Sequence, residues 1–335
     1  MAENTKYTFK DFKSDQQVRW CPGCGDIAIM SSIQKAMAEM DTSLENYAVI
    51  SGIGCSSRFP YYMSTYGFHG IHGRAGALAS GVKTANPKLS VWQITGDGDA
   101  LAIGGNHFIH EIRRNIDLNV ILFNNQIYGL TKGQYSPTSF YGQVTKTSPY
   151  GTVEQPFEPG ELVIGSNGTF FARGIDANVQ MNIEIFKEAE KHRGTSIVEV
   201  LQNCVIFNDG IYDELTNKEH KEDRQLYLRH GEPMIFGKNR DKGLMLDGFD
   251  LKVVKIGENG ITEKDILVHN AHDIRPYMQL MLIKMKLPVA LGVIRAVALP
   301  TYDNAVHKQI DEVISKSKIK CMDDLLNSGS TWVVE

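Results

Sequence analysis

The sequence predicts an α/β protein with a doubly wound, mostly parallel sheet and helices on both faces. Short, continuous apolar runs of strand length recur along the first 200 residues, and segments with helical periodicity separate them. A strand that is apolar at every position is buried on both faces, which happens when helices cover both sides of a parallel sheet. The chain has 335 residues, of which 42% are hydrophobic, so it is long enough to bury a large core.

The alternating segments can be assigned in order. Apolar runs predict strands at 47–53, 89–95, 118–123, 168–172 and 196–201. Helical spacing predicts helices at 26–40, 73–86, 100–115 and 181–192, and Pro87 ends the second of them. Together they describe five strands and four helices, with one helix before the first strand and the irregular segment 126–160 between the third and fourth strands.

Two regions depart from this pattern. Residues 126–160 are rich in Gly, Pro, Ser, Thr and Tyr without a clear period, and an irregular segment of that length is usually functional or ordered by a partner. Residues 205–260 are polar and turn-rich, 274–300 are apolar again, and 305–317 favour a helix. We therefore expect a core domain at 1–205 and a C-terminal region at 206–335.

Charge and hydropathy exclude several classes of protein. The net charge is −4 and no run of five basic residues occurs, which argues against nucleic-acid and membrane-surface binding. The longest apolar stretch, 277–299, is interrupted by Lys284, Lys286 and Arg295, so no membrane span is predicted. Residues 1–10 are polar and show no secretory signal.

The five cysteines rule out a disulfide scaffold and indicate a reducing compartment. Cys21 and Cys24 form a Cys-x-x-Cys pair, whereas Cys55 and Cys204 each follow a predicted strand. Because the carboxyl ends of parallel strands share one edge of a sheet, all four thiols can converge there. Four thiolates suit zinc or an iron–sulfur cluster, and a redox dithiol or ordinary core cysteines are the alternatives. Cys321 has no partner by spacing.

A second motif, Gly96-Asp97-Gly98-Asp99, follows a predicted strand and opens a helix, where free backbone N–H groups favour a phosphate. The carboxylate of Asp97 repels a phosphate, so the two groups can lie close together only with a divalent cation between them, most simply Mg²⁺. After 25 further residues, Asn124-Asn125 ends the next strand and offers an amide oxygen, and the carbonyl of Ile127 offers another. A plain turn is the alternative interpretation. The motif lacks the third glycine of a dinucleotide-binding loop and the Gly-Lys-Ser/Thr of a P-loop.

Taken together, these motifs resemble the β subunit of 2-oxoacid:ferredoxin oxidoreductases, densely over about 18–207 and more loosely towards the C-terminus. The segments that carry the resemblance occur in one order: Trp20–Gly25, Gly52–Ser57, His72–Ala75, Gly96–Asp99, Asn124–Gly133, Ser148–Gly151 and Cys204.

The resemblance implies a thiamin diphosphate-binding fold in which 1–205 carries the diphosphate half of the site and 206–335 packs on the same domain or on a partner. It implies that Asp97, Asn125 and the carbonyl of Ile127 bind Mg²⁺. The cysteines that it assigns to one 4Fe–4S cluster are Cys21, Cys24, Cys55 and Cys204. The residues that it assigns to the cofactor are Ile53, Gly54, Cys55, His72, Gly96, Asp97, Gly98, Asp99, Asn125, Ile127, Gly129 and Leu130.

The family's chemistry is the oxidative decarboxylation of a 2-oxoacid, reversible as a reductive carboxylation. Thiamin stabilises the electron-rich intermediate, electrons leave singly through the cluster to ferredoxin, and coenzyme A takes the acyl group. The chain lacks a recognisable glutamate for the aminopyrimidine and is short for both halves of a thiamin site. The resemblance therefore implies an α subunit that supplies the pyrimidine half, in an αβ or α₂β₂ assembly in the cytoplasm.

Three residues are candidates for substrate binding. Arg58 and Lys132 can bind a second carboxylate, which favours 2-oxoglutarate over pyruvate, and His72 is a polar group expected near the thiamin. The alternatives are a surface or interface charge for Arg58 and a solvated loop lysine for Lys132, and the nearby His69 is interpreted as a structural histidine. The loops 207–210 and 229–236 also look like the 2-oxoglutarate branch.

Other functions remain open at this point. A pyruvate or broad-range 2-oxoacid:ferredoxin oxidoreductase is the alternative within the same family. A non-redox thiamin lyase or decarboxylase would lack the cluster, and a non-catalytic scaffold subunit would use the same cysteines to bind zinc.

Overall fold

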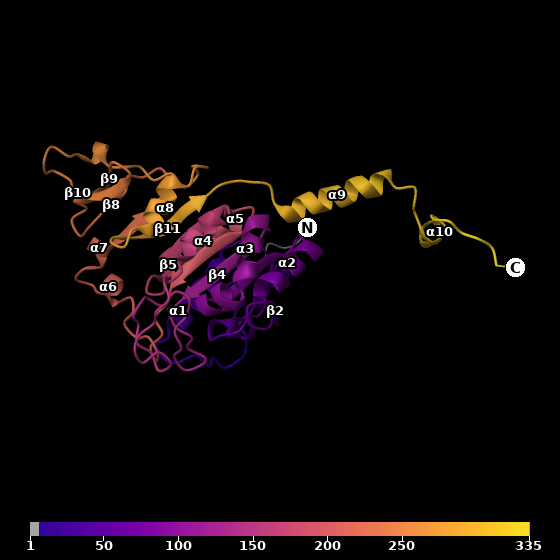
Figure 1. Cartoon of the computed structure of the whole chain (residues 1–335), viewed down its shortest axis with the longest axis horizontal. Coiled ribbons are helices and arrows are strands. Elements are labelled where there is room, and N and C mark those ends of the chain that lie inside the picture. The colour runs from indigo at the N-terminus through magenta and orange to yellow at the C-terminus, as the bar shows by residue number, and fades with distance from the viewer. Residues whose placement is uncertain (1–6, 335) are drawn as a thin grey trace.

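A computed structural model of the protein describes residues 7–334 and consists of one large sheet with helices on both faces (Figure 1). The eight strands lie in the order β2-β1-β3-β4-β6-β5-β11-β7. Their bounds are β1 Tyr47–Ser51, β2 Tyr66–His69, β3 Ser90–Gly96, β4 Asn119–Asn124, β5 Phe170–Ile175, β6 Ser196–Leu201, β7 Gln225–Leu228 and β11 Val289–Ala296. Neighbouring strands are parallel except for β11 and β5, so the predicted mostly parallel α/β fold is confirmed.

Alternation along the central strands explains the two covered faces. In β4, Ile121 and Phe123 belong to one apolar cluster, whereas Val120 and Leu122 belong to the cluster on the other face. Successive side chains of a strand point to opposite faces, so an unbroken apolar run has to be buried twice.

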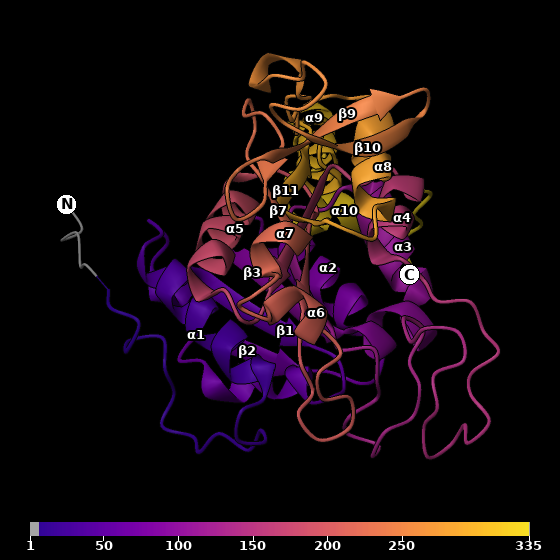
Figure 2. The ribbon, with the colours of Figure 1, turned by 90° about the vertical axis from the view of Figure 1, so that its left-hand side faces the viewer.

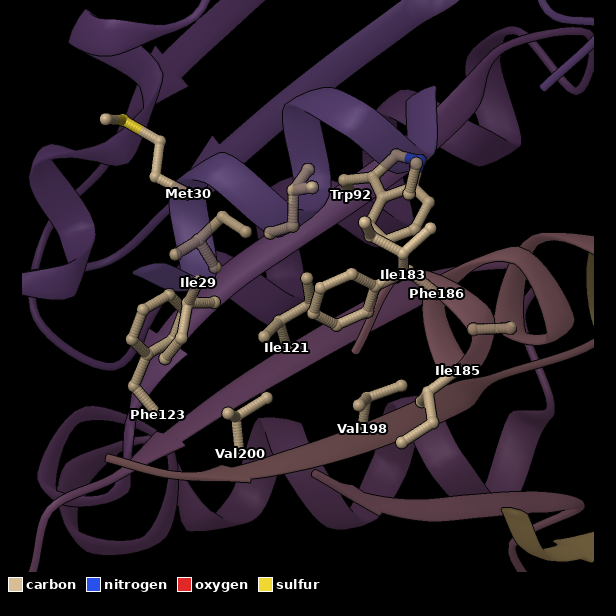
Figure 3. Close-up of a cluster of buried hydrophobic side chains, with 14 of the residues drawn as sticks. Ile29, Met30, Trp92, Ile121, Phe123, Ile183, Ile185, Phe186, Val198 and Val200 are labelled. Carbon is tan, nitrogen blue, oxygen red and sulfur yellow. The ribbon is translucent and has the colours of Figure 1, made fainter. Parts of the chain in front are cut away.

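Helices provide that burial on each side. The helices α1 (Gly25–Ala38) and α5 (Val179–Lys191) cover the first face, and Figure 3 shows their Ile29 and Phe186 packed over Trp92 and Ile121 of the sheet. On the second face lie α2 (Ala75–Ala85), α3 (Gly105–Arg114), α4 (Pro159–Gly165) and α8 (Tyr277–Lys284).

The structure differs from the predicted elements in three places. The helix expected at 100–115 begins as a π-helical turn, η3 (Asp99–Ile103), and continues as α3. The sequence pattern does not predict strand β2, because it is only four residues long and its aromatic side chains are exposed rather than part of an apolar run. The polar region after 205 contains β7 of the main sheet and a separate three-stranded sheet.

The remaining elements are short or peripheral. The second sheet is formed by β8 (Ile235–Phe236), β9 (Lys242–Asp247) and β10 (Asp250–Lys255). The other helices and turns are η1 Leu44–Asn46, η2 Ser56–Tyr62, α6 Asp213–Thr216, α7 Lys221–Arg224, η4 Glu263–Asp265, α9 Tyr302–Lys316 and α10 Met322–Leu326. The apolar segment at 274–300 is α8 followed by β11, and α9 confirms the helix predicted at 305–317.

The C-terminal helices α9 and α10 form an arm that leaves the body of the molecule (Figure 1). Its base is fixed by His307, whose ring lies 2.9 Å from the carbonyl of Thr84, and by Asp303, which accepts a hydrogen bond from the amide of Asp117. Within residues 7–334, every helix is too short or too polar to cross a membrane. Part of the polar N-terminal segment, 1–6, lies outside the described residues.

The long segment between β4 and α4 contains no regular structure, as predicted, and Figure 2 shows it as an extended set of loops at one edge of the molecule. In Figure 2 the N-terminal lead-in lies on the opposite side, at the lower left beside α1.

Candidate active site

The predicted site residues lie at one edge of the sheet, where β1, β3, β4 and β6 end. The turns that leave these strands contain Gly52–Cys55, Gly96–Asp99, Asn124–Ile127 and Gln202–Cys204. In doubly wound sheets, ligands bind at the carboxyl edge. The edge has two parts, a cysteine cavity and the diphosphate turn Gly96–Asp99.

The cysteine cavity has a volume of about 220 Å³, and the structure brings four of the five cysteines to its wall: Cys21, Cys24, Cys55 and Cys204. Gly129 closes the wall between two of them, because a methyl group added to it would lie 3.6 Å from the sulfurs of both Cys55 and Cys204. Cys321 is exposed at the start of α10.

The shape of this cavity indicates the kind of group that fits. Among the described residues, no three His, Cys, Asp or Glu side chains converge tightly enough to hold a single metal ion. The four thiols instead surround a space much larger than one ion, and thiolate sulfurs are the donors that iron–sulfur clusters take. The donor set and the space therefore fit a cluster better than one zinc ion.

Burial controls the thiols in this cavity. It raises the pKa of Cys55 to about 11, helped by the negative charge of Asp26, and it also raises the pKa of Cys24. The side-chain amide of Gln202 lies 3.4 Å from the sulfur of Cys24, and the indole of Trp20 donates to the carbonyl of Cys55 at 2.6 Å. The raised pKa keeps Cys24 and Cys55 protonated, and binding of a metal would release these protons because ligation requires the thiolate.

The diphosphate turn holds its first carboxylate, Asp97, in a buried position with only 2% of the residue exposed. Its Oδ2 accepts hydrogen bonds from the hydroxyls of Ser136 and Thr138, both at 2.5 Å. Burial raises the pKa of Asp97 to about 6, and the two hydroxyls act in the opposite direction. Neither hydroxyl is predicted from the sequence, where the only signal is the Ser-Pro-Thr-Ser run inside the long irregular segment.

The second carboxylate, Asp99, ties three loops together. Its Oδ1 accepts from the amide of Ile53 at 3.1 Å, from the amide of Gly73 at 2.7 Å and from Nδ1 of His72 at 2.7 Å. Its Oδ2 accepts from the hydroxyl of Thr95 at 2.7 Å. Asp99 thus positions the turns around 53 and 72 against the diphosphate turn, and His72 presents its other ring nitrogen away from this bond.

Two glycines are required for this close packing. A methyl group on Gly98 would lie 2.1 Å from the ring of Tyr128, and one on Gly52 would lie 2.0 Å from Asp99. A side chain at Gly98 would displace the ring of Tyr128, and one at Gly52 would displace the carboxylate of Asp99. The turn leads into η3, whose first amides point along the helix start where a phosphate is favoured.

The side chains of the predicted cation ligands Asp97 and Asn125 share no hydrogen-bond partner among the described residues. Asn125 lines the cysteine cavity, where its amide donates to Gln202 at 2.8 Å and its oxygen accepts from the amide of Ile127 at 3.2 Å. The preceding Asn124 is the residue linked to Asp97, through a hydroxyl that both side chains share. The structure thus brings Asn124 rather than Asn125 into the network of Asp97, and Mg²⁺ ligation by Asn125 and Ile127 stays a prediction.

The substrate candidates Arg58 and Lys132 both line the cysteine cavity, beside Leu130. Neither has an ion-pair partner within the part of the chain that the structure describes. Lys132 has φ of 72° in a tight turn that its amide closes onto the carbonyl of Gly129. Two uncompensated positive charges thus face the cavity, whereas His72 lies on the diphosphate side.

Large apolar side chains are exposed on the segments around this edge, which is unusual for a surface that water covers. They are Tyr61, Tyr66, Phe68, Ile71, Leu130, Phe140, Tyr141, Tyr150 and Ile206. Exposed apolar side chains on neighbouring segments are a feature of surfaces that bind another protein or a ligand.

Comparison with known proteins identifies a thiamine pyrophosphate-binding domain in this chain. Residues 52–200 match the family described as "Thiamine pyrophosphate enzyme, C-terminal TPP binding domain". The matched segment begins at the turn after β1 and ends in β6, so it contains the diphosphate turn.

Similar whole chains are oxidoreductase subunits. The chain is 48% identical to the 2-oxoglutarate oxidoreductase subunit KorB of Mycobacterium tuberculosis, over 97% of this chain and 88% of that protein. It is 37% identical to the 2-oxoglutarate synthase subunit KorB of Methanocaldococcus jannaschii, over 76% of this chain and 91% of that protein.

A solved structure also matches along the whole length. The 2-oxoglutarate:ferredoxin oxidoreductase from Magnetococcus marinus, with 2-oxoglutarate, coenzyme A and succinyl-CoA bound, superposes with a TM-score of 0.79. Its sequence is 29% identical, and the match covers 98% of both chains.

Proposed function

From its membership of one family we propose the reaction of this chain and the role of each part of its site. The chain belongs to the β subunits of the 2-oxoacid:ferredoxin oxidoreductases, on the 2-oxoglutarate branch. The protein is a subunit of an oxidoreductase. We propose that the enzyme converts 2-oxoglutarate, coenzyme A and oxidised ferredoxin to succinyl-CoA, CO₂ and reduced ferredoxin, and that the reaction is reversible.

The diphosphate turn is the proposed site of Mg²⁺ and thiamin diphosphate. Asp97 supplies a carboxylate oxygen to the cation, Asn125 and the carbonyl of Ile127 supply further oxygens, and Gly96 and Gly98 let the backbone approach the phosphates. Asp99 positions the surrounding loops. When bound, the cofactor supplies decarboxylation of a 2-oxoacid and holds the electron pair that remains.

The cysteine cavity is the proposed site of a 4Fe–4S cluster. The observation that carries this proposal is that four thiols from four separate positions, Cys21, Cys24, Cys55 and Cys204, line one cavity of about 220 Å³. Gln202 donates to the sulfur of Cys24, a contact that tunes a cluster by stabilising charge on sulfur. The cluster would receive electrons singly and pass them to ferredoxin.

Two cationic side chains that line the cavity, Arg58 and Lys132, are the proposed substrate-binding residues. Arg58 and Lys132 have no carboxylate to neutralise among the described residues, so we assign them to the distal carboxylate of 2-oxoglutarate or, for Lys132, to the phosphates of coenzyme A. The related enzyme from Magnetococcus marinus was solved with both ligands, which supports this choice of substrates.

The active enzyme needs a second chain. The family match covers only the C-terminal type of thiamin-binding domain, the relatives are named as subunits, and an exposed apolar surface borders the site. We propose an α subunit that covers this surface and contributes the pyrimidine half of the thiamin site, in an αβ or α₂β₂ assembly. A cluster held by free thiols requires a reducing compartment, which we take to be the cytoplasm.

Co-expression with the α subunit under anaerobic conditions tests this function. The purified complex should reduce ferredoxin when 2-oxoglutarate and coenzyme A are both present, and much more slowly with pyruvate. Equal rates with pyruvate would make it a pyruvate or broad-range enzyme. Release of CO₂ without ferredoxin reduction would make it a non-redox thiamin lyase, and a complex inactive towards every 2-oxoacid would contradict both.

A further inference from the structure

Three hydroxyl side chains of one short turn, Ser136, Thr138 and Ser139, are almost completely buried at the diphosphate turn. They belong to the long irregular segment that follows β4, and no residue in this turn belongs to the cysteine or diphosphate motifs. Serine and threonine are usually exposed, so three buried hydroxyls in four positions need partners, and the partners indicate their role.

The first two hydroxyls bind the same oxygen atom. Ser136 Oγ and Thr138 Oγ1 both lie 2.5 Å from Oδ2 of Asp97, the carboxylate proposed to bind the cation. A carboxylate held by two hydrogen bonds on one oxygen cannot rotate freely. Its other oxygen, Oδ1, is the one that these hydroxyls leave for a cation.

The same turn also holds the second half of the motif. Thr138 Oγ1 lies 2.9 Å from Oδ1 of Asn124, and Ser139 Oγ donates to the carbonyl of Gln126 at 2.6 Å. The turn is itself closed by Ser139 Oγ, which accepts from the amide of Ser136 at 2.8 Å. One turn thus connects Asp97, at the end of β3, to residues at the end of β4.

Buried charges fix the far side of this network. The amide of Asn124 donates to Glu199 at 2.7 Å, and the other oxygen of Glu199 accepts from Arg173 at 2.7 Å. Arg173 also pairs with Glu158, so one guanidinium bridges two carboxylates. Since Asn124 Nδ2 is engaged, its Oδ1 must face Thr138, and the acceptor there is not free to move.

The number of hydroxyl hydrogens explains why two hydroxyls are present. Thr138 has one hydroxyl hydrogen and two acceptors, Asp97 Oδ2 and Asn124 Oδ1, so it satisfies only one at a time. Ser136 supplies the second donor. When Thr138 donates to Asn124, Ser136 still donates to Asp97, so with both hydroxyls in place both buried acceptors have a donor.

We propose that Ser136 and Thr138 are positioning residues for the cation and diphosphate: they orient Asp97 and lock the loop over it. The proposal rests on the proposed cation site at Asp97 and adds the residues that make the site rigid. It predicts that removing the hydroxyls weakens cofactor binding although neither residue is a ligand.

The test compares variants of the complete complex with the α subunit. Ser136→Ala, Thr138→Val and the double variant remove the hydroxyls, and Thr138→Ser restores one. Thr152→Val is the matched control, because Thr152 is equally buried in the same segment but its hydroxyl binds the carbonyl of Phe140 at 2.9 Å. The readouts are calorimetric binding of thiamin diphosphate with Mg²⁺ and hydrogen exchange of residues 134–140.

We expect the double variant to bind the cofactor about 10- to 100-fold more weakly, the loss associated with hydrogen bonds to a charged group. Exchange of 134–140 should rise, whereas Thr138→Ser and Thr152→Val should stay close to the parent in both measurements. Unchanged cofactor affinity in the double variant would overturn the proposal, as would an equal loss in Thr152→Val.

Failure of the proposed function gives a different result. If the unmodified complex binds no thiamin diphosphate and Mg²⁺, or if Asp97→Asn binds them as tightly as the parent, the cation site itself is wrong. If the parent binds them, Asp97→Asn does not, and the hydroxyl variants bind normally, only the positioning role is wrong.

Discussion

The diphosphate turn and the cysteine cavity lie at the same edge of one sheet but are built in opposite ways. Asp97 and Asp99 are buried and held by donors from their own chain, including two hydroxyls and two backbone amides. The four cysteines line an open cavity, and the two cations beside it lack ion-pair partners among the described residues. The first part is shaped by contacts within the chain, whereas we propose that a bound cluster completes the second.

The largest expected effect is at the cavity, where the proposed cluster would hold the four cysteines together. Cys55→Ser replaces a thiol that faces Cys204 across Gly129, and a hydroxyl is a poor ligand for iron. Turnover of 2-oxoglutarate should fall by more than the roughly 100-fold that outer-shell changes cost at metal sites. Visible absorbance and iron content of the anaerobic complex measure the loss. Cys321→Ser, on the exposed arm, is the control and should retain both; equal retention in Cys55→Ser would refute the cluster site.

On the diphosphate side, Asp99→Ala should damage the preformed scaffold. The substitution leaves the amides of Ile53 and Gly73 without their acceptor. Because hydrogen bonds to a charged group contribute up to about 3 kcal/mol, we expect a loss of roughly 100-fold in cofactor affinity. Calorimetry with thiamin diphosphate and Mg²⁺ measures it. Asp99→Asn keeps the Oδ1 acceptor and should lose much less; an equal loss would show that charge rather than positioning matters.

Arg58→Met tests whether the cavity cations select the substrate. Loss of a charged partner for the distal carboxylate should lower kcat/KM for 2-oxoglutarate by about 30-fold. Activity with pyruvate, which has no second carboxylate, should be unchanged or higher. Steady-state rates with both acids in the same complex provide the comparison. A parallel fall for both substrates would remove Arg58 from substrate recognition.

The smallest effect concerns the support behind the diphosphate turn. Burial raises the pKa of Glu111, on α3, to about 8, and its hydrogen bond from Gln93 opposes this only weakly. The folded protein therefore keeps a proton that the unfolded chain releases above about pH 4.5, so stability falls as the pH rises from about 4.5 to 8.

Glu111→Gln keeps the shape and removes this titration. Its urea midpoint should vary less between pH 6 and pH 8 than that of the parent, which loses at most about 1.4 kcal/mol per pH unit from this group. Glu188→Gln, on the outer side of α5, should keep the slope of the parent. Identical slopes for parent and Glu111→Gln would mean that Glu111 is ionised in the folded protein.

The central elements can be predicted from the sequence because each strand of the core is apolar at successive positions, as β4 shows. Strand β2 cannot be predicted in this way, because its side chains are exposed. The strands after 205 cannot be predicted either, because β7 and β11 join the sheet by pairing with residues far away in the sequence. The cysteines can be grouped because strand ends share an edge. Ser136 and Thr138 cannot be found in this way, because they lie 39 and 41 positions from Asp97 in the sequence, within an irregular segment that has no motif.

The visible spectrum of the anaerobic αβ complex, before and after addition of 2-oxoglutarate and coenzyme A, tests most directly whether this chain joins a thiamin site to a cluster. We predict a broad absorbance that bleaches when both substrates are present and recovers with oxidised ferredoxin. A colourless complex, or a spectrum that the substrates leave unchanged, would contradict that claim.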